Sequence, residues 1–300
     1  MKARYLIAAA LSALTLASGA QAHRQWMLPS STILSGTDGW VTVDAAVSND
    51  LFYFDHNPMG TDNIVVTEPD GAIGKIENAA KGHYRSTFDV HLTKPGTYRI
   101  ASVSSGLMGS YSLNGEVKRL PRGTTKDTLA AAIPAGATNV QTAEASNRNE
   151  IFVTLGAPTT AIFKPTGVGI ELAPVTHPDD LVAGEAATFQ FLLDGKPASG
   201  LKVTVIPGGN RYRDALGQID LVADKDGKVA ITWPSAGMYW LNASLGGGRE
   251  GGEGPSGGPG MGGAQRAPGA AQGGGGPRPA PSGPPQRRAG YSTTLEVLAP

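Results

Sequence analysis

A period-two alternation of apolar and polar residues recurs along most of this chain, and it constrains the fold more than any other feature. Side chains of a β-strand point alternately to the two faces of a sheet, so the alternation predicts strands with one buried face. Turn-forming triplets such as Pro69-Asp70-Gly71 separate these segments,. We therefore expect an all-β protein of two antiparallel β-sandwich domains, Ig-like or transthyretin-like, with little helix. The predicted strands are 40–44, 63–67, 86–92, 97–101, 149–155, 187–193, 201–206, 228–233, 238–243 and 291–298.

One segment lacks the alternation. Residues 106–149 are polar, and we predict that they form irregular structure with two helical turns over 126–133 that end at Pro134,.

A faint internal repeat indicates that the two sandwiches are built alike. Residues 95–102 and 236–244 share a core in which a glycine turn is followed by x-Tyr-x and an apolar residue. Under this interpretation the glycines form turns and the tyrosines pack in or beside the cores. A connector marked by proline surrounds Ala173 and Pro174, so we predict an N-terminal domain over 23–172 and a C-terminal domain over 173–300,.

The first 22 residues have the pattern of a cleavable secretory signal peptide. Lys2 and Arg4 precede about a dozen apolar residues, and Ala20-Gln21-Ala22 is a small-x-small cleavage motif,. The apolar stretch is too short for a membrane span, which needs about 20 residues. We expect cleavage after Ala22, a mature chain that begins at His23, a periplasmic location and no membrane span in the processed protein.

Glycine and proline are concentrated between residues 246 and 290. Such a segment has little apolar surface to bury and loses much entropy on ordering, so it is predicted to be disordered. Residues 238–245 and 291–298 on either side are both strand-like, and we expect them to pair as a hairpin that carries this long insertion. The closure cost of so long a loop grows only slowly with its length.

Charge and cysteine content exclude several classes of protein. Without Lys2 and Arg4 the mature chain holds 23 basic and 25 acidic residues, and it has no basic block. Electrostatics therefore gives no case for nucleic acid as a partner. An exported chain without cysteine has no disulfide framework and no thiolate metal site, so its stability must come from apolar cores,.

The sequence contains no common catalytic motif in a predicted strand or helix. His-Glu-x-x-His and the phosphate-binding Gly-x-x-x-x-Gly-Lys are absent, the one Gly-x-Ser-x-Gly match falls at 254–258 within the Gly/Pro-rich segment, and no cysteine can act as a nucleophile,. We therefore expect a protein that is not an enzyme. The one enzymatic alternative with support from a residue is a copper oxidase that uses a terminal histidine as a brace.

Histidines carry the remaining chemical possibilities. After cleavage, His23 would present an α-amine and an imidazole on one residue, a combination that suits nickel, cobalt, copper or zinc. The best second ligand is His56, in a loop with aromatic residues and Asp55, whose carboxylate can ligate or orient the ring,. His177 lies in the connector and is a third candidate ligand. The plainer interpretation, that these histidines are structural, stays open. His83 and His91 look like turn and solvent-facing residues.

Three stretches resemble the exported DUF4198 family, which is grouped with periplasmic components of nickel and cobalt uptake systems. They are residues 22–29, residues 149–158 continuing to 169–181, and residues 193–198 followed by 205–214. The resemblance covers nearly the whole mature chain, while the Gly/Pro insertion departs from the pattern. It implies β-sandwich domains, periplasmic residence and a link to transition-metal uptake. The C-terminal unit also resembles carboxypeptidase-regulatory and transthyretin-like modules.

Two functional hypotheses follow. The first is a periplasmic accessory protein of nickel or cobalt uptake that binds or hands on a metal ion through His23, with an inner- or outer-membrane metal transporter as its partner. The alternative is a non-catalytic envelope binding or scaffold module of two β-sandwiches, associated with a transporter or receptor.

Overall fold

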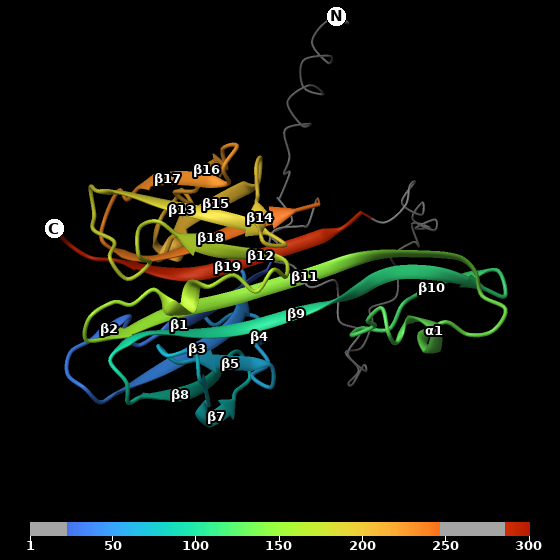
Figure 1. Cartoon of the computed structure of the whole chain (residues 1–300), viewed down its shortest axis with the longest axis horizontal. Coiled ribbons are helices and arrows are strands. Elements are labelled where there is room, and N and C mark those ends of the chain that lie inside the picture. Colours follow the sequence, from blue (N-terminus) through green and yellow to red (C-terminus); the bar gives the residue numbers. More distant parts are fainter. Residues whose placement is uncertain (1–22, 247–285) are drawn as a thin grey trace, which may run out of the picture.

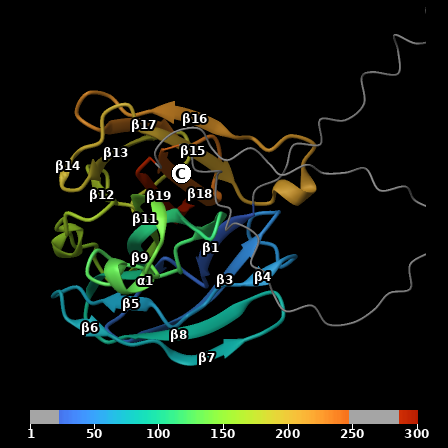
Figure 2. The same ribbon diagram turned by 90° about the vertical axis from the view of Figure 1, so that its right-hand side faces the viewer.

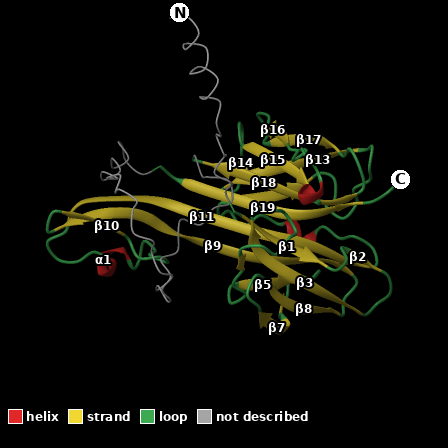
Figure 3. Ribbon diagram, turned by 180° about the vertical axis from the view of Figure 1, so that it is seen from behind, coloured by secondary structure: helices red, strands yellow, loops and turns green. Residues whose placement is uncertain are grey.

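The computed structural model describes residues 23–246 and 286–300 of the chain. Strands hold 54% of these residues and helices 4%, which confirms the predicted all-β sandwich fold (Figure 3). The predicted signal peptide lies outside the described residues, as does the insertion between residues 247 and 285. Residues 288–290 were predicted to belong to the insertion, but they form the start of the last strand.

Three sheets make up the molecule. The first has five strands in the order β1 (Arg24–Pro29), β3 (Gly39–Ser48), β8 (Ser86–Leu92) and β7 (Glu77–Lys81), with β4 (Asn57–Pro58) also paired to β3. The smallest holds β12 (Ile170–Pro174), β13 (Ala186–Leu193) and β14 (Lys196–Pro197). Strand β17 (Lys228–Thr232) pairs with β13 on the edge opposite β12.

The third sheet runs through the whole molecule. Its order is β16 (Ile219–Val222), β15 (Lys202–Pro207), β18 (Gly237–Leu245), β19 (Arg288–Val297), β11 (Thr138–Leu155), β9 (Gly96–Leu113), β5 (Ile64–Thr67) and β6 (Ile73–Gly74). Two short strands attach to it, β10 (Glu116–Arg119) on β9 and β2 (Ile33–Leu34) on β11. Figure 1 shows this sheet crossing the middle of the molecule, with β3 and β8 below it and β13 and β17 above.

Two apolar cores fill the spaces on either side of the shared sheet. One lies against the sheet of β1, β3 and β8, and the other against the sheet of β12, β13 and β17 (Figure 2). Strand β11 faces both cores, because Ile151, Val153 and Leu155 point into the first and Phe152 points into the second. This is why all its residues from 148 to 155 are buried.

The two halves of the chain are joined within the shared sheet. Strand β19 pairs antiparallel with β18, as predicted for the hairpin that carries the insertion. On its other edge it pairs in parallel with β11, from Ala145 opposite Arg288 to Glu150 opposite Thr293. The predicted domain boundary at residue 173 falls inside β12, and Ile162 and Ile170 before it pack in the second core.

The segment predicted to be irregular, residues 106–149, is mostly strand. Strands β9 and β11 pair antiparallel from Gly96 opposite Leu155 out to Ser112 opposite Thr138, which makes a long ribbon. Figure 1 shows this ribbon extending beyond the rest of the molecule towards β10 and α1. The predicted two helical turns shrink to one, α1 (Leu129–Ala132). The other described helices are two short 3-10 turns, η1 (Ala161–Phe163) and η2 (Asn210–Tyr212).

Candidate metal centre

The loop that carries His56 is folded by hydrogen bonds at the end of β3. The indole of Trp26 donates to the Ser48 hydroxyl at 2.7 Å, and that hydroxyl donates to the carbonyl of Asp50 at 2.6 Å. The Asp55 carboxylate accepts from the backbone N–H of Asn49 at 2.9 Å. These bonds reverse the chain, so that β4 can return along β3 with Asn57 opposite Val47.

This register places the two predicted metal ligands at the same end of β3. His23 immediately precedes Arg24, which is opposite Ser48 on one edge of β3. His56 immediately precedes Asn57, which is opposite Val47 on the other edge. The two imidazole rings stack with their centroids 3.6 Å apart and their planes 8° from parallel. Residues 33 positions apart in the sequence therefore meet because both flank a single strand.

The surroundings of His23 favour its uncharged ring. Partial burial lowers the pKa of His23, and the charge that His56 carries when protonated lowers this pKa further. The nearby Asp55 carboxylate acts in the opposite direction and is the smallest of the three causes. The neutral imidazole is the form that binds a metal ion, so these effects favour ligation.

The second half of the chain holds the His56 loop from outside. The side chain of Asn210 accepts from the N–H of Leu51 at 3.0 Å and donates to the Asp50 carboxylate at 2.9 Å. The guanidinium of Arg211 lies 3.7 Å from the centre of the Tyr53 ring. No role was predicted for these two residues from the sequence. The only sequence feature that pointed to Asn210 and Arg211 is that they lie within residues 205–214, one of the stretches that resemble the DUF4198 family.

His177 lies in another part of the molecule and is bonded through both ring nitrogens. Its Nδ1 accepts from the N–H of Asp179 at 3.1 Å, which leaves the proton on Nε2. Nε2 lies 3.2 Å from the carbonyl of Thr159 and 3.1 Å from the Thr97 hydroxyl. The structure does not bring His177 to the stacked pair, and these contacts give it a structural role at the junction of the two halves.

The two remaining histidines are also apart from the pair. The ring of His83 packs edge-on against Tyr84 with centroids 4.5 Å apart. His91 is partly exposed on the outer face of its sheet, as predicted from its phase with Asp89, and its Nε2 lies 2.9 Å from the Asp38 carboxylate.

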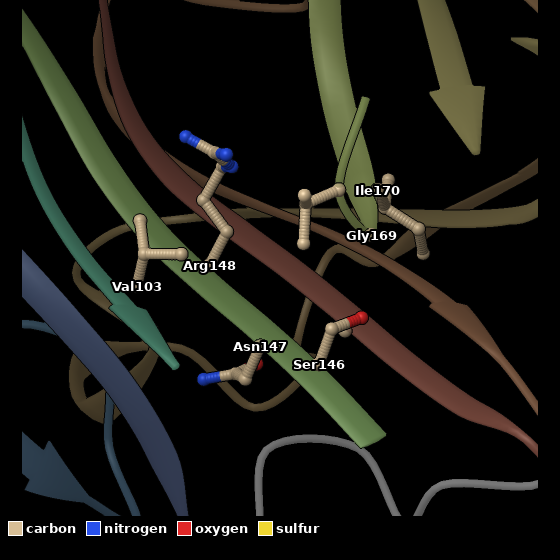
Figure 4. A pocket seen from close by; sticks show the side chains of 8 residues that line it. Val103, Ser146, Asn147, Arg148, Gly169 and Ile170 are labelled. Carbon is tan, nitrogen blue, oxygen red and sulfur yellow. The ribbon is translucent and has the colours of Figure 1, made fainter. Parts of the chain in front are cut away.

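A buried polar cluster beside a small pocket was not predicted from the sequence. The guanidinium of Arg148 lies between the carboxylates of Glu150 and Glu171, at 3.3 Å from each. Arg148 comes from β11, and Figure 4 shows it beside a pocket that Gly169 and Ile170 also line. Both carboxylates are nearly inaccessible and already paired, so the cluster serves to satisfy buried charges where the sheets meet,.

Only two described side chains, the imidazoles of His23 and His56, come together at the stacked pair as potential metal ligands. Within residues 23–246 and 286–300, no group of three or more His, Asp or Glu side chains is arranged to hold a metal ion. A third donor at this position has to come from the backbone, and the α-amine that cleavage after Ala22 would release lies on His23 itself.

No helix in the described part of the chain has the length and apolar character of a membrane span. Comparison with solved structures gives matches of very low structural similarity. The D0-D1 domain of intimin is 15% identical with a TM-score of 0.18, and the match covers 72% of this chain and 88% of that one. Escherichia coli alpha-2-macroglobulin activated by porcine elastase is 12% identical with a TM-score of 0.19, over 74% of this chain and 29% of that one. The human OSCAR ligand-binding domain is 10% identical with a TM-score of 0.17, over 74% and 90%. Scores this low carry no functional argument.

No curated protein matches the chain. One family model does match, over residues 20–247, and its description is a domain of unknown function, DUF4198. The match spans more than half of the chain and takes in both strands that flank the end of β3, together with the loop that contains Asn210. The chain belongs to the DUF4198 family.

Proposed function

We propose that this protein binds a divalent transition-metal ion in the periplasm through the amine and imidazole of the mature N-terminal His23 and the imidazole of His56. The observation that carries the proposal is the contact of the two rings at 3.6 Å. Metal–nitrogen bonds are about 2.0–2.1 Å long, so two nitrogens on one ion lie at most about 4.2 Å apart. The ring centroids are closer together than this limit, so a tilt of the rings can bring one nitrogen of each to a common ion.

Chelation requires a small rearrangement of the pair. The lone pairs of imidazole nitrogens lie in the ring planes, so two parallel rings must tilt before both nitrogens point to one ion. His23 is only partly buried, which leaves its side chain room to turn. His56 is held more firmly, because its loop is bonded to Asn49 through Asp55 and to Asn210 through Asp50.

An all-nitrogen donor set selects the class of metal. Amine and imidazole ligands suit nickel, cobalt, copper and zinc, and none of these donors favours magnesium or calcium. Three protein donors leave coordination positions open, and an ion held this way can pass to a ligand on another protein. We propose that the protein is an accessory of nickel or cobalt uptake and hands its ion to a metal transporter of the inner or outer membrane, with binding and transfer as its only chemistry.

Metal titration of the processed protein tests the proposal. Nickel, cobalt, copper and zinc are titrated into protein that begins at His23 and into protein that retains Ala22. We expect the extended form and His56→Ala to bind at least about tenfold more weakly, because second-shell changes alone cost 10–100-fold. His83→Ala is the matched control and should bind as the unaltered protein does. Equal affinity with and without Ala22 would exclude the amine as a ligand.

A second function is favoured by the ribbon of β9 and β11, which extends beyond the two sandwiches. An elongated two-stranded projection is a surface for another protein rather than for a metal ion. We propose as the alternative a non-catalytic scaffold module that docks on an envelope transporter or receptor. A protein that carries no metal after isolation from its native periplasm, but captures an envelope partner through this ribbon, would favour the alternative.

A further inference from the structure

A cavity of about 380 Å³ lies where the first sheet meets the edge of the shared sheet. It is bounded by β5, β6, β7 and the end of β8, and β6 and β8 appear on the same side of the molecule in Figure 2. The volume is near the lower end for small-molecule pockets, so it accommodates one or two rings rather than a folded partner. None of the histidines at the proposed metal centre lines it.

The walls of the cavity combine apolar surface with both donors and acceptors of hydrogen bonds. Val66, Ile73 and Val90 supply the apolar part. The polar part comes from two carboxylates, an ammonium group, an imidazole and a hydroxyl, on Glu68, Glu77, Lys75, His91 and Thr93.

Each of the two carboxylates that line the cavity contacts a lysine. Lys75 lies 3.1 Å from Glu77, and Lys94 lies 2.6 Å from Glu68 and the same distance from Asp70. A strongly anionic ligand such as a phosphate ester would meet both lining carboxylates, and a bare divalent cation would have to displace both lysines. These contacts favour a neutral ligand.

An aromatic platform stiffens one wall. The indole of Trp40 stacks on the His91 ring, with centroids 4.2 Å apart and planes 4° from parallel. The His91 ring is also held by Asp38, whose carboxylate lies 2.9 Å from His91 Nε2. Trp40 remains 47% exposed, whereas Trp26, Trp233 and Trp240 are at most 1% exposed. The indole does not itself line the cavity; it holds the ring of His91, which does, in one orientation, so the wall presents a fixed flat ring to a ligand,.

We propose that this cavity, together with the Trp40–His91 platform, binds a neutral saccharide. A sugar ring has an apolar face of C–H groups for aromatic stacking and hydroxyls that both donate to carboxylates and accept from ammonium and imidazole groups. Its size suits the cavity, and it carries no charge that the lining carboxylates or their lysines would repel. The proposal concerns residues apart from the metal centre, so it holds or fails independently of the metal-binding function.

Titration with disaccharides tests the site. Cellobiose, maltose and N,N′-diacetylchitobiose are added to the full-length processed protein, and binding is followed by calorimetry and by acrylamide quenching of tryptophan fluorescence. Trp40 alone of the four tryptophans is accessible to the quencher. We expect at least one sugar to bind and to change the quenching.

Variants locate the binding. Glu77→Gln should weaken it about fivefold, the effect of losing one hydrogen bond, and His91→Ala should weaken it by at least as much. Both positions are at the surface, and a thermal unfolding curve verifies that each variant folds. Tyr212→Ala, at a residue 82% exposed in the other half of the molecule, is the control and should have no effect.

Three results would overturn the proposal. Absence of binding by every disaccharide would mean that the cavity is a solvent-filled gap. Binding that Glu77→Gln and His91→Ala leave unchanged would place the sugar elsewhere. Preferential binding of inorganic phosphate or glucose 6-phosphate in a parallel titration would identify an anion site instead.

Discussion

The repeated tyrosines show how a faint sequence pattern corresponds to a specific residue role. The hydroxyl of Tyr98 accepts from the N–H of Lys94 at 2.8 Å and donates to the carbonyl of the same residue at 3.0 Å. The hydroxyl of Tyr239 donates to the carbonyl of Ser235 at 2.8 Å. In both repeats the tyrosine thus closes the turn four residues before it, as a tyrosine corner does in immunoglobulin-like domains. This agrees with the structural role predicted for both residues.

Removing either hydroxyl should destabilise the fold. Tyr98→Phe leaves partly buried backbone groups of the turn without their side-chain partner, and we expect it to lower the free energy of unfolding by about 1–3 kcal/mol,. Tyr239→Phe should cost a similar amount. Urea denaturation followed by circular dichroism measures both changes. Tyr84→Phe, at a residue 46% exposed, is the control. If neither corner variant differs from this control, the hydroxyls contribute nothing to stability.

Asp179 makes stability depend on pH. The pKa of Asp179 is raised to about 7, mainly by burial and to a smaller extent by the neighbouring Glu296 carboxylate, while the hydrogen bond from Thr154 acts against both. The folded state therefore keeps a proton that the unfolded chain, with a carboxyl pKa of 3.8, releases. The stabilisation from this proton is complete below about pH 4 and is lost as the pH rises through about 7.

Asp179→Asn removes this titration while it keeps an acceptor for Thr154. We expect the variant and the unaltered protein to have similar stability near pH 4. Above pH 7 the variant should be more stable by a few kcal/mol, since one pH unit corresponds to about 1.4 kcal/mol. Urea unfolding at a series of pH values gives the comparison. A difference in stability that stays constant across this range would show that Asp179 titrates alike in both states.

At the scale of elements, the structure separates what local patterns predict from what they do not. Strand β8 was predicted at its observed bounds, because its residues alternate strictly between buried and half-exposed. The outer part of the β9–β11 ribbon was missed, because its serines, glycines and asparagines give no alternation. Its pairing is nevertheless tight, since a Cβ at Gly109 would lie 1.9 Å from the carbonyl oxygen of Gln141.

The histidine pair was foreseen only in part. His23 and His56 were chosen for their chemistry, and their proximity depends on β1 and β4 flanking the same strand, which no local pattern encodes. The role of Asn210 was not foreseen at all. Its two bonds to the loop join residues about 160 positions apart, and one asparagine in a turn carries no sequence signature of such a contact.

Asn210 should position the His56 loop. Asn210→Ala removes the acceptor of the Leu51 N–H and the donor to Asp50, so the loop loses its anchor to the second half of the molecule. We expect metal affinity to fall about tenfold, with a loss of only about 1 kcal/mol in stability. Calorimetric metal titration and urea unfolding measure the two effects. Gln218→Ala, a change in the same half, should alter neither, and an unchanged affinity in Asn210→Ala would exclude the positioning role.

At the scale of the whole molecule, the shared sheet should make the two halves unfold together. Strand β19 lies between β18 and β11 and supplies side chains to the second core, while its partner β11 supplies side chains to both cores. Leu295 packs in the second core and Ile151 in the first, both almost fully buried. We expect Leu295→Ala and Ile151→Ala each to shift one common unfolding transition by about 2–5 kcal/mol.

Scanning calorimetry distinguishes this from independent halves. A single transition that both variants lower together is the expected result, and Val222→Ala at an exposed position serves as the reference. Two transitions, each sensitive to only one of the variants, would show that the halves unfold separately.

The place of β19 in the chain sets a condition on when the protein can acquire its fold. The strand lies within residues 288–300, and its parallel partner β11 begins at residue 138. A ribosome synthesises the chain from its N-terminus, so the edge of β11 that pairs with β19 stays unpaired until residues 288–297 have emerged. Completion of the shared sheet is therefore linked to the synthesis of a segment more than 130 residues after the end of β11.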